Sequence, residues 1–347
     1  MKKIIALLAA ATMVAGFASA QGKANELLGS GATFPQPLYV AIFDQYLKAN
    51  KVKVNFNGNG SGAGIKDLST KTTDFGASDA PMNEGEIKAA GAEVVHVPAT
   101  IGAIVVTYNV PGVKTGLKLT GSVIAGIFLG TIDKWNDAEI VKLNPGVKLP
   151  DLQIIVVRRS DSSGTSFNFT GYLTKVSPEW AKNVGQNKSP KWPVGVGGKG
   201  NPGVASYVKQ VPGSLGYVEI AYAIQNKMDV ALIQNKSGNF IDPRDLKAVS
   251  LAGDVEFPAD GKADIIDTPA KGGYPIAATT WLLVYKDQSY TKDAAKSKAV
   301  VDLFWYVLHD GQKLSEKNLY AQLPPSAIKV AEHLIKSVTF DGKALKD

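Results

Sequence analysis

The 347-residue chain contains no cysteine and only three histidines. Without cysteine it can form no disulfide and no thiolate metal site, and it has no thiol nucleophile. His96, His309 and His333 lie far apart in the sequence, so none has a second histidine at metal-binding spacing. No serine stands in a G-x-S-x-G motif. The sequence therefore predicts no metal site and no cofactor, and we expect the protein not to be an enzyme.

Long apolar runs are also rare, and the clearest one lies at the N-terminus. Met1-Lys2-Lys3 precedes an apolar stretch over residues 4–17, which is followed by Ala18-Ser19-Ala20. A positive start, a short apolar stretch and an A-x-A site are typical of a secretory signal peptide, and the stretch is too short to span a membrane. We therefore expect residues 1–20 to be a signal peptide that is cleaved near Ala20, and the mature chain to be a soluble periplasmic protein.

Basic residues exceed acidic ones, which gives a formal net charge of +7. The lysines and arginines are scattered along the chain without interleaved aromatic residues, so the sequence does not favour nucleic-acid binding. Solvated lysines explain the balance, and an anionic ligand is compatible with it. At this length the chain can form two domains, and it contains no internal repeat and no low-complexity linker.

Apolar strand-like stretches, turns rich in glycine or serine, and helical periodicity alternate along most of the chain. This alternation is typical of α/β proteins with a largely parallel sheet, in which ligands bind at the carboxyl ends of strands beside helix N-termini. Residues 29–35 are expected to form a loop, and residues 235–273 are expected to consist of loops and short elements. Strands are expected at 52–56, 73–77, 94–97, 101–108, 154–159, 213–218 and 281–284, and helices at 38–47, 65–68, 123–129, 204–208, 219–228, 294–309 and 327–335.

The stretch 154–166, IIVVRRSDSSGTS, combines a buried strand, two arginines and a helix start. A helix N-terminus attracts anions because its N–H groups are unpaired and the helix dipole is positive there. The guanidinium of Arg159 and the hydroxyls of Ser163 and Thr165 would add hydrogen-bond donors. Asp161 is close enough in sequence to hold Arg159 in place. The stretch therefore predicts an oxyanion clamp.

Three further polar turns follow strand ends or precede helices: 31–34 (GATF), 60–64 (GSGAG) and 76–79 (GASD). Each alone is more often a helix cap or a tight turn than a ligand site. Together with the clamp they predict an anion site built from several helix N-termini. The glycine-rich run 195–200 fits neither the dinucleotide-binding pattern nor the P-loop, and we expect it to be structural. The sequence pattern indicates no role for Arg158, the other arginine of the clamp stretch.

Five segments, 29–35, 60–62, 74–81, 156–167 and 195–201, together resemble the periplasmic phosphate-binding proteins of the bacterial ABC-type phosphate-uptake system. The resemblance extends along essentially the whole mature chain. It implies an α/β protein with the two-lobed, type II periplasmic binding-protein fold, in which mixed sheets are flanked by helices and the ligand lies in the interlobe cleft.

The resemblance also implies the lobes, the ligand and the partner. Residues 21–105 and 282–347 would form lobe I, and 106–281 would form lobe II. The protein would be a monomer that binds inorganic phosphate and delivers it to an inner-membrane ABC permease complex. The family's ligand contacts would fall on Thr33, Phe34, Ser61, Asp79, Arg159, Ser163, Gly164 and Thr165, with Asp161 orienting the arginine.

Asp79 supplies a chemical reason for selecting phosphate. An ionised carboxylate only accepts hydrogen bonds, and phosphate near neutral pH carries one or two protons whereas sulfate carries none. Bound sulfate would leave Asp79 unpaired and would repel it, at a cost of roughly several kcal/mol. Three alternatives stay open: a receptor for another tetrahedral oxyanion such as sulfate or molybdate, an exported phosphatase, and a secreted scaffold or adhesin.

Overall fold

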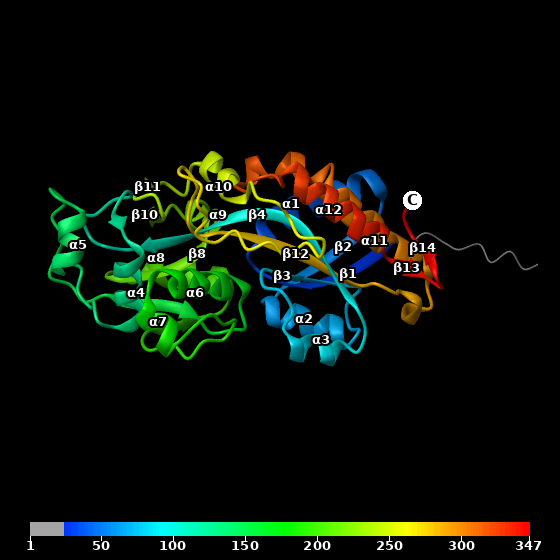
Figure 1. Ribbon diagram of the computed structural model, residues 1–347, viewed down its shortest axis with the longest axis horizontal. Coiled ribbons are helices and arrows are strands. Elements are labelled where there is room, and N and C mark those ends of the chain that lie inside the picture. Colours follow the sequence, from blue (N-terminus) through cyan, green and yellow to red (C-terminus); the bar gives the residue numbers. More distant parts are fainter. Residues whose placement is uncertain (1–23) are drawn as a thin grey trace, which may run out of the picture.

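The computed structural model describes residues 24–347, so the expected signal peptide lies outside the described residues. Two groups of helices and strands follow one another along the long axis of the molecule (Figure 1). Two long strands, β4 (Val94–Tyr108) and β12 (Ala277–Tyr285), run along this axis and connect the groups. The two ends of the molecule are therefore joined by sheet strands.

The largest sheet has the order β2-β1-β3-β12-β4-β8-β6-β7, with β9 also paired to β4. Its pairs β1–β2, β1–β3, β6–β7 and β6–β8 are parallel, whereas β12 is antiparallel to β3 and β4, and β4 is antiparallel to β8 and β9. The expectation of a largely parallel sheet is therefore wrong, because the two connecting strands run against their neighbours, and the mixed arrangement is confirmed. The remaining strands of this sheet are β1 (Glu26–Gly31), β2 (Lys53–Gly58), β3 (Phe75–Ser78), β6 (Ile155–Arg159), β7 (Val196–Gly198), β8 (Ser214–Glu219) and β9 (Asp229–Val230).

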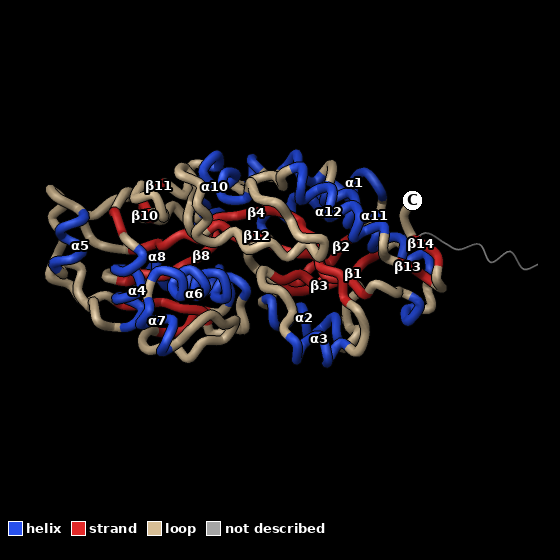
Figure 2. Tube along the Cα trace, in the orientation of Figure 1, coloured by secondary structure: helices blue, strands red, loops and turns tan. Residues whose placement is uncertain are grey.

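Helices cover both groups of strands, as the tube view makes clear (Figure 2). Around β1–β3 lie α1 (Gln36–Asn50), α2 (Ser61–Ser69), α3 (Glu84–Ala90), α11 (Ala294–Leu308) and α12 (Pro325–Lys336). The other group contains α4 (Gly121–Leu129), α5 (Ala138–Leu143), α6 (Gly164–Val176), α7 (Pro178–Asn183), α8 (Gly200–Gln210), α9 (Ile220–Gln225) and α10 (Leu246–Gly253). Smaller elements are β5 (Lys118–Leu119), β10 (Leu232–Gln234), β11 (Phe240–Ile241), β13 (Thr339–Phe340), β14 (Lys343–Ala344) and the 3₁₀ turns Ser289–Thr291, Gly311–Leu314 and Glu316–Asn318.

Strand β1 extends into a stretch that the sequence predicts to be loop. Gly29 and Gly31 are part of this strand, and neighbouring atoms leave no room for a side chain at either position. A Cβ on Gly29 would lie 2.2 Å from the ring of Phe75, and one on Gly31 would lie 2.0 Å from the carbonyl oxygen of Ala77. Glycine here permits close approach to β3 and does not mark a turn, so the loop prediction is wrong for these residues.

Strand β4 changes partner along its length. Residues 94–103 pair with β12, and residues 104–108 pair with β8. All of β12 pairs with β3 or the first part of β4. We therefore propose lobe boundaries at 103/104 and 276/277, close to the expected boundary at 105/106 but before the expected boundary at 281/282, which would divide β12.

One continuous apolar core runs through both groups of elements and includes most of the apolar residues of β4, which is buried from Val95 to Tyr108. Burying a large apolar side chain stabilises a fold by about 1.5–3 kcal/mol, so this strand anchors both ends of the molecule. Among residues 24–347, no helix has the length and apolar character needed to cross a bilayer.

Candidate functional site

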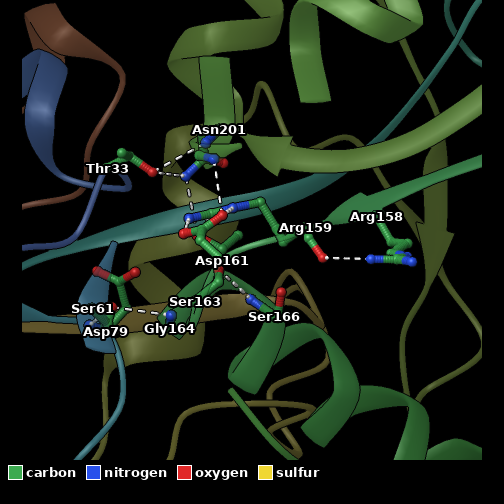
Figure 3. Close-up of polar contacts among 12 residues, drawn as sticks. Thr33, Ser61, Asp79, Arg158, Arg159, Asp161, Ser163, Gly164, Ser166 and Asn201 are labelled. Carbon is green, nitrogen blue, oxygen red and sulfur yellow. Dashed lines mark hydrogen bonds and ion pairs between the residues drawn. The ribbon is translucent and has the colours of Figure 1, made fainter. Parts of the chain in front are cut away.

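Polar residues from five separate segments meet between the two lobes (Figure 3). They follow β1, β3 and β6 or begin α2 and α8, which are the carboxyl ends of strands and the N-termini of helices. This is where α/β proteins place ligands. Each of the following side chains is at most 3% exposed: Thr33, Ser61, Asp79, Arg159, Ser163, Thr165 and Asn201.

Arg159, at the end of β6, is held by a carboxylate. Its Nε donates to Asp161 Oδ1 at 2.8 Å and its Nη2 donates to Asp161 Oδ2 at 2.5 Å. Its Nη1 donates to Thr165 Oγ1 at 3.2 Å. A guanidinium carries five N–H groups, so two remain for a ligand. Burial raises the pKa of Asp161, but the hydrogen bond and charge of Arg159 outweigh burial and hold this pKa below its usual value.

The N-terminus of α6 is capped and closely approached by the opposite lobe. Ser163 is the N-cap, and its Oγ accepts a hydrogen bond from the backbone N–H of Ser166 at 3.0 Å. The backbone N–H of Gly164 donates to Ser61 Oγ at 3.0 Å. A Cβ at Gly164 would lie 2.5 Å from Ser61 Oγ and 2.7 Å from Asp79 Cβ. Only glycine therefore allows the two walls to approach this closely.

Asp79 is buried, and no cationic side chain within residues 24–347 forms an ion pair with it. Its Oδ1 accepts a hydrogen bond from Thr280 Oγ1 at 2.9 Å, and its backbone N–H donates to Ser61 Oγ at 3.2 Å. Burial raises the pKa of Asp79 to about 7, although Thr280, Arg159 and Ser61 each lower it. The carboxyl group can therefore gain or release a proton near neutral pH.

Thr33 and Phe34 contribute in different ways. Thr33 Oγ1 accepts hydrogen bonds from the backbone N–H of Asn201 at 3.1 Å and from Asn201 Nδ2 at 2.9 Å. The ring of Phe34 is fully buried, with its centroid 6.3 Å from that of Tyr320, and its carbonyl accepts a hydrogen bond from the Tyr320 hydroxyl at 2.6 Å. Phe34 is thus fixed by its ring and carbonyl, and its backbone N–H is the polar group that could serve a ligand.

The structure brings all nine predicted residues into one cluster and adds Asn201, Thr280 and Asn168. Asn168 Nδ2 donates to the backbone carbonyl of Asp79 at 2.5 Å, which ties α6 to the opposite lobe. Asn201 is the last residue of the glycine-rich segment 195–201, and the sequence pattern of this segment indicated no role for its asparagine. Thr280 follows Thr279 in a strand that is apolar elsewhere, and nothing in the local sequence distinguishes it as a site residue.

Arg158 points away from the cluster (Figure 3). Its Nη1 donates to the carbonyl of Arg159 at 3.4 Å, and its buried Nε has no hydrogen-bond partner among the described residues. Within residues 24–347, no group of three or more histidine, aspartate or glutamate side chains is arranged to hold a metal ion.

Comparisons with known proteins agree with this geometry. Residues 18–303 match the model of a PBP superfamily domain. The chain is 43% identical over 315 residues to the phosphate-binding protein PstS of Xylella fastidiosa (strain Temecula1), an alignment that covers 90% of this chain and 85% of that protein. It is 42% identical over 328 residues to PstS of Pasteurella multocida, covering 93% and 94% of the two chains.

Among solved structures, the phosphate-binding protein from Stenotrophomonas maltophilia superposes with a TM-score of 0.68 at 19% identity, covering 89% of this chain and 93% of that one. At this identity the likeness concerns the fold, and it confirms the two-lobed periplasmic binding-protein architecture. Together with the high identity to the curated relatives, it shows that the chain belongs to the PstS family of phosphate-binding proteins.

Proposed function

We propose that this protein binds inorganic phosphate in the periplasm and delivers it to an inner-membrane ABC phosphate importer. The observation that carries the proposal is the buried carboxyl group of Asp79, which lies among hydrogen-bond donors. The PstS proteins of Xylella fastidiosa and Pasteurella multocida, which are named for phosphate binding, support it. The PstS family comprises substrate-binding proteins, so the chain is a binding protein and not an enzyme.

The ligand residues of the proposal are Thr33, Phe34, Ser61, Asp79, Arg159, Ser163, Gly164 and Thr165. Arg159 offers the two N–H groups that Asp161 and Thr165 leave unused. Because Asp161 neutralises most of the charge of Arg159, donor geometry contributes more to binding than net attraction does. Such a site distinguishes oxyanions by their hydrogen-bonding pattern.

Asp79 makes the pattern specific for a protonated oxyanion. When ionised, its carboxylate can accept a hydrogen bond from a P–OH group, whereas sulfate has no proton to offer. A bound sulfate would face a buried carboxylate without a hydrogen bond, and the two negative charges would repel each other. The phosphate-to-sulfate preference should therefore depend on Asp79.

Isothermal titration calorimetry of the wild-type protein and Asp79→Asn with phosphate and sulfate tests this proposal. We expect the wild type to bind phosphate and to reject sulfate. Asp79→Asn should lower the phosphate-to-sulfate affinity ratio by about tenfold or more, since an amide can donate to either anion. Asp44→Asn, on the exposed face of α1, removes the same charge away from the site and should leave the ratio unchanged.

Sulfate binding at micromolar or tighter affinity without phosphate binding would replace this function with that of a sulfate receptor. An unchanged phosphate-to-sulfate affinity ratio in Asp79→Asn would refute the proposed role of Asp79 but not phosphate binding itself. We further propose that the protein acts as a monomer, that residues 1–20 are removed near Ala20, and that the two lobes close around the ligand by bending of β4 and β12.

A further inference from the structure

Asn201 lies at the N-terminal end of α8 and is completely buried. Its side-chain amide contacts both walls of the site: Nδ2 donates to Thr33 Oγ1 of lobe I at 2.9 Å and to Thr165 Oγ1 of lobe II at 3.1 Å. Both protons of this amide nitrogen are therefore used, one on each threonine.

The orientation of the Asn201 amide follows from a third contact. The backbone N–H of Glu219, which can only donate, lies 2.8 Å from Asn201 Oδ1. Exchanging the oxygen and nitrogen of the amide would bring two donors together at Glu219 and leave both threonines without their donor. The nitrogen of Asn201 must therefore face the threonines.

The two threonine hydroxyls then have no acceptor capacity left. A hydroxyl oxygen has two lone pairs and one proton. Thr33 Oγ1 accepts from the backbone N–H and from Nδ2 of Asn201. Thr165 Oγ1 accepts from Asn201 Nδ2 and from Arg159 Nη1. Within residues 24–347 neither hydroxyl donates a hydrogen bond, so each has only its proton to offer to a ligand.

We propose that Asn201 is a specificity-determining positioning residue that forces Thr33 and Thr165 to act as donors toward the ligand. The inference rests on the proposed function, because it takes phosphate as the ligand. Ser61 lies outside the inference, since its hydroxyl is also within reach of Asp79. With both threonines restricted to donation, neither can accept a hydrogen bond from a P–OH group, so the few acceptors that remain, Asp79 foremost among them, limit how many protons the bound oxyanion can carry.

A double-mutant cycle measured by calorimetry with inorganic phosphate at pH 8 tests the proposal. Asn201→Asp keeps the acceptor for Glu219 but replaces the donor with an acceptor, so a threonine proton can turn away from the ligand. We expect phosphate affinity to fall by about tenfold or more. In a Thr33→Val/Thr165→Val background there is no hydroxyl to turn, and Asn201→Asp should cost less than about threefold.

If Asn201→Asp acted only through its added negative charge, or if Asn201 had a purely structural role, affinity would fall equally in both backgrounds, and that result would overturn the inference. If Asn201→Asp fails to fold, as judged by circular dichroism, the single variants Thr33→Val and Thr165→Val decide the question. Each should lose about tenfold in affinity. Unchanged affinity in either would overturn the inference, whereas absence of phosphate binding by the wild type would overturn the proposed function as well.

Discussion

At the scale of single residues, the two aspartates of the site have pKa values shifted in opposite directions, that of Asp161 downward and that of Asp79 upward. Asp161 makes two hydrogen bonds with Arg159, which keep it ionised, whereas the carboxylate of Asp79 accepts from the neutral hydroxyl of Thr280. The first neutralises a cation, and the second is poised to exchange a proton with a ligand.

The raised pKa of Asp79 predicts how the stability of the phosphate-free protein changes with pH. The pKa of Asp79 is about 7 in the folded protein, and its ordinary value of 3.8 applies to the unfolded chain. The folded state therefore holds the proton more tightly, so its stability relative to the unfolded state is greatest below pH 3.8 and decreases as the pH rises to 7. Asparagine does not titrate, so Asp79→Asn should not show this loss of stability with rising pH. Its stability relative to wild type should therefore rise between pH 4 and pH 7, by on the order of 4 kcal/mol.

Urea unfolding of both phosphate-free proteins at several pH values measures this difference. A difference between Asp79→Asn and wild type that stays constant with pH would contradict the raised pKa.

The four polar segments could be predicted from the sequence to form one anion site because each follows a strand or begins a helix, whereas the nine individual residues were expected from the family resemblance. Asn201 and Thr280 could not be predicted, because their roles arise from partners far away in the chain. Asn201 contacts Thr33 across 168 positions, and Thr280 contacts Asp79 across 201. Local patterns contain no information about such pairings, which the fold alone creates.

At the scale of elements, α6 is placed so that its first residue contacts the opposite lobe. Gly164→Ala would push a methyl group into Ser61 and Asp79. We expect the substitution to weaken phosphate binding by about tenfold or more, because the walls can no longer meet. The unfolding temperature of the phosphate-free protein should change little, since alanine favours helix more than glycine does.

Calorimetry and thermal unfolding separate these two effects. Gly85→Ala is a matched control in the first turn of α3, where the nearest atom to a new Cβ is Asn83 Oδ1 at 3.3 Å. It should leave phosphate affinity unchanged. Equal affinities of Gly164→Ala and wild type would show that close contact at α6 is not needed for binding.

Long elements with clear periodicity, such as α1 and α11, could be predicted from the sequence. The short helices α5 and α7 could not, because six residues do not display a helical period. The end of strand β1 could not be predicted either, because its glycines are typical of a loop, whereas in the structure they allow close packing against β3.

At the scale of the whole molecule, a partly buried ion pair links the lobes beside the site. Lys188 Nζ of lobe II contacts both carboxylate oxygens of Glu86 in α3, at 2.5 Å from Oε1. The backbone carbonyl of Lys188 also accepts a hydrogen bond from the N–H of Ser163 at 2.9 Å. This pair joins the lobes only when they are in contact, so it should stabilise the closed state over an open one.

Lys188→Met should therefore favour the open state and weaken phosphate binding. A partly buried pair contributes about 1–2 kcal/mol, which corresponds to a loss of affinity of roughly fivefold to thirtyfold. Small-angle scattering should give a larger radius of gyration for the variant at subsaturating phosphate. Lys48→Met, which breaks an exposed ion pair within α1, is the control. If the two variants had the same affinity for phosphate, the proposed role of Lys188 would be wrong.

The position of β12 between β3 and β4 has a consequence for the order in which the chain folds. As the protein is synthesised, β3 and β4 emerge early, but the strand that separates them appears only after all of lobe II. Lobe II can assemble its own part of the sheet from the end of β4 with β8, β6 and β7. Lobe I contains the beginning of the described chain and is nevertheless the last to be completed.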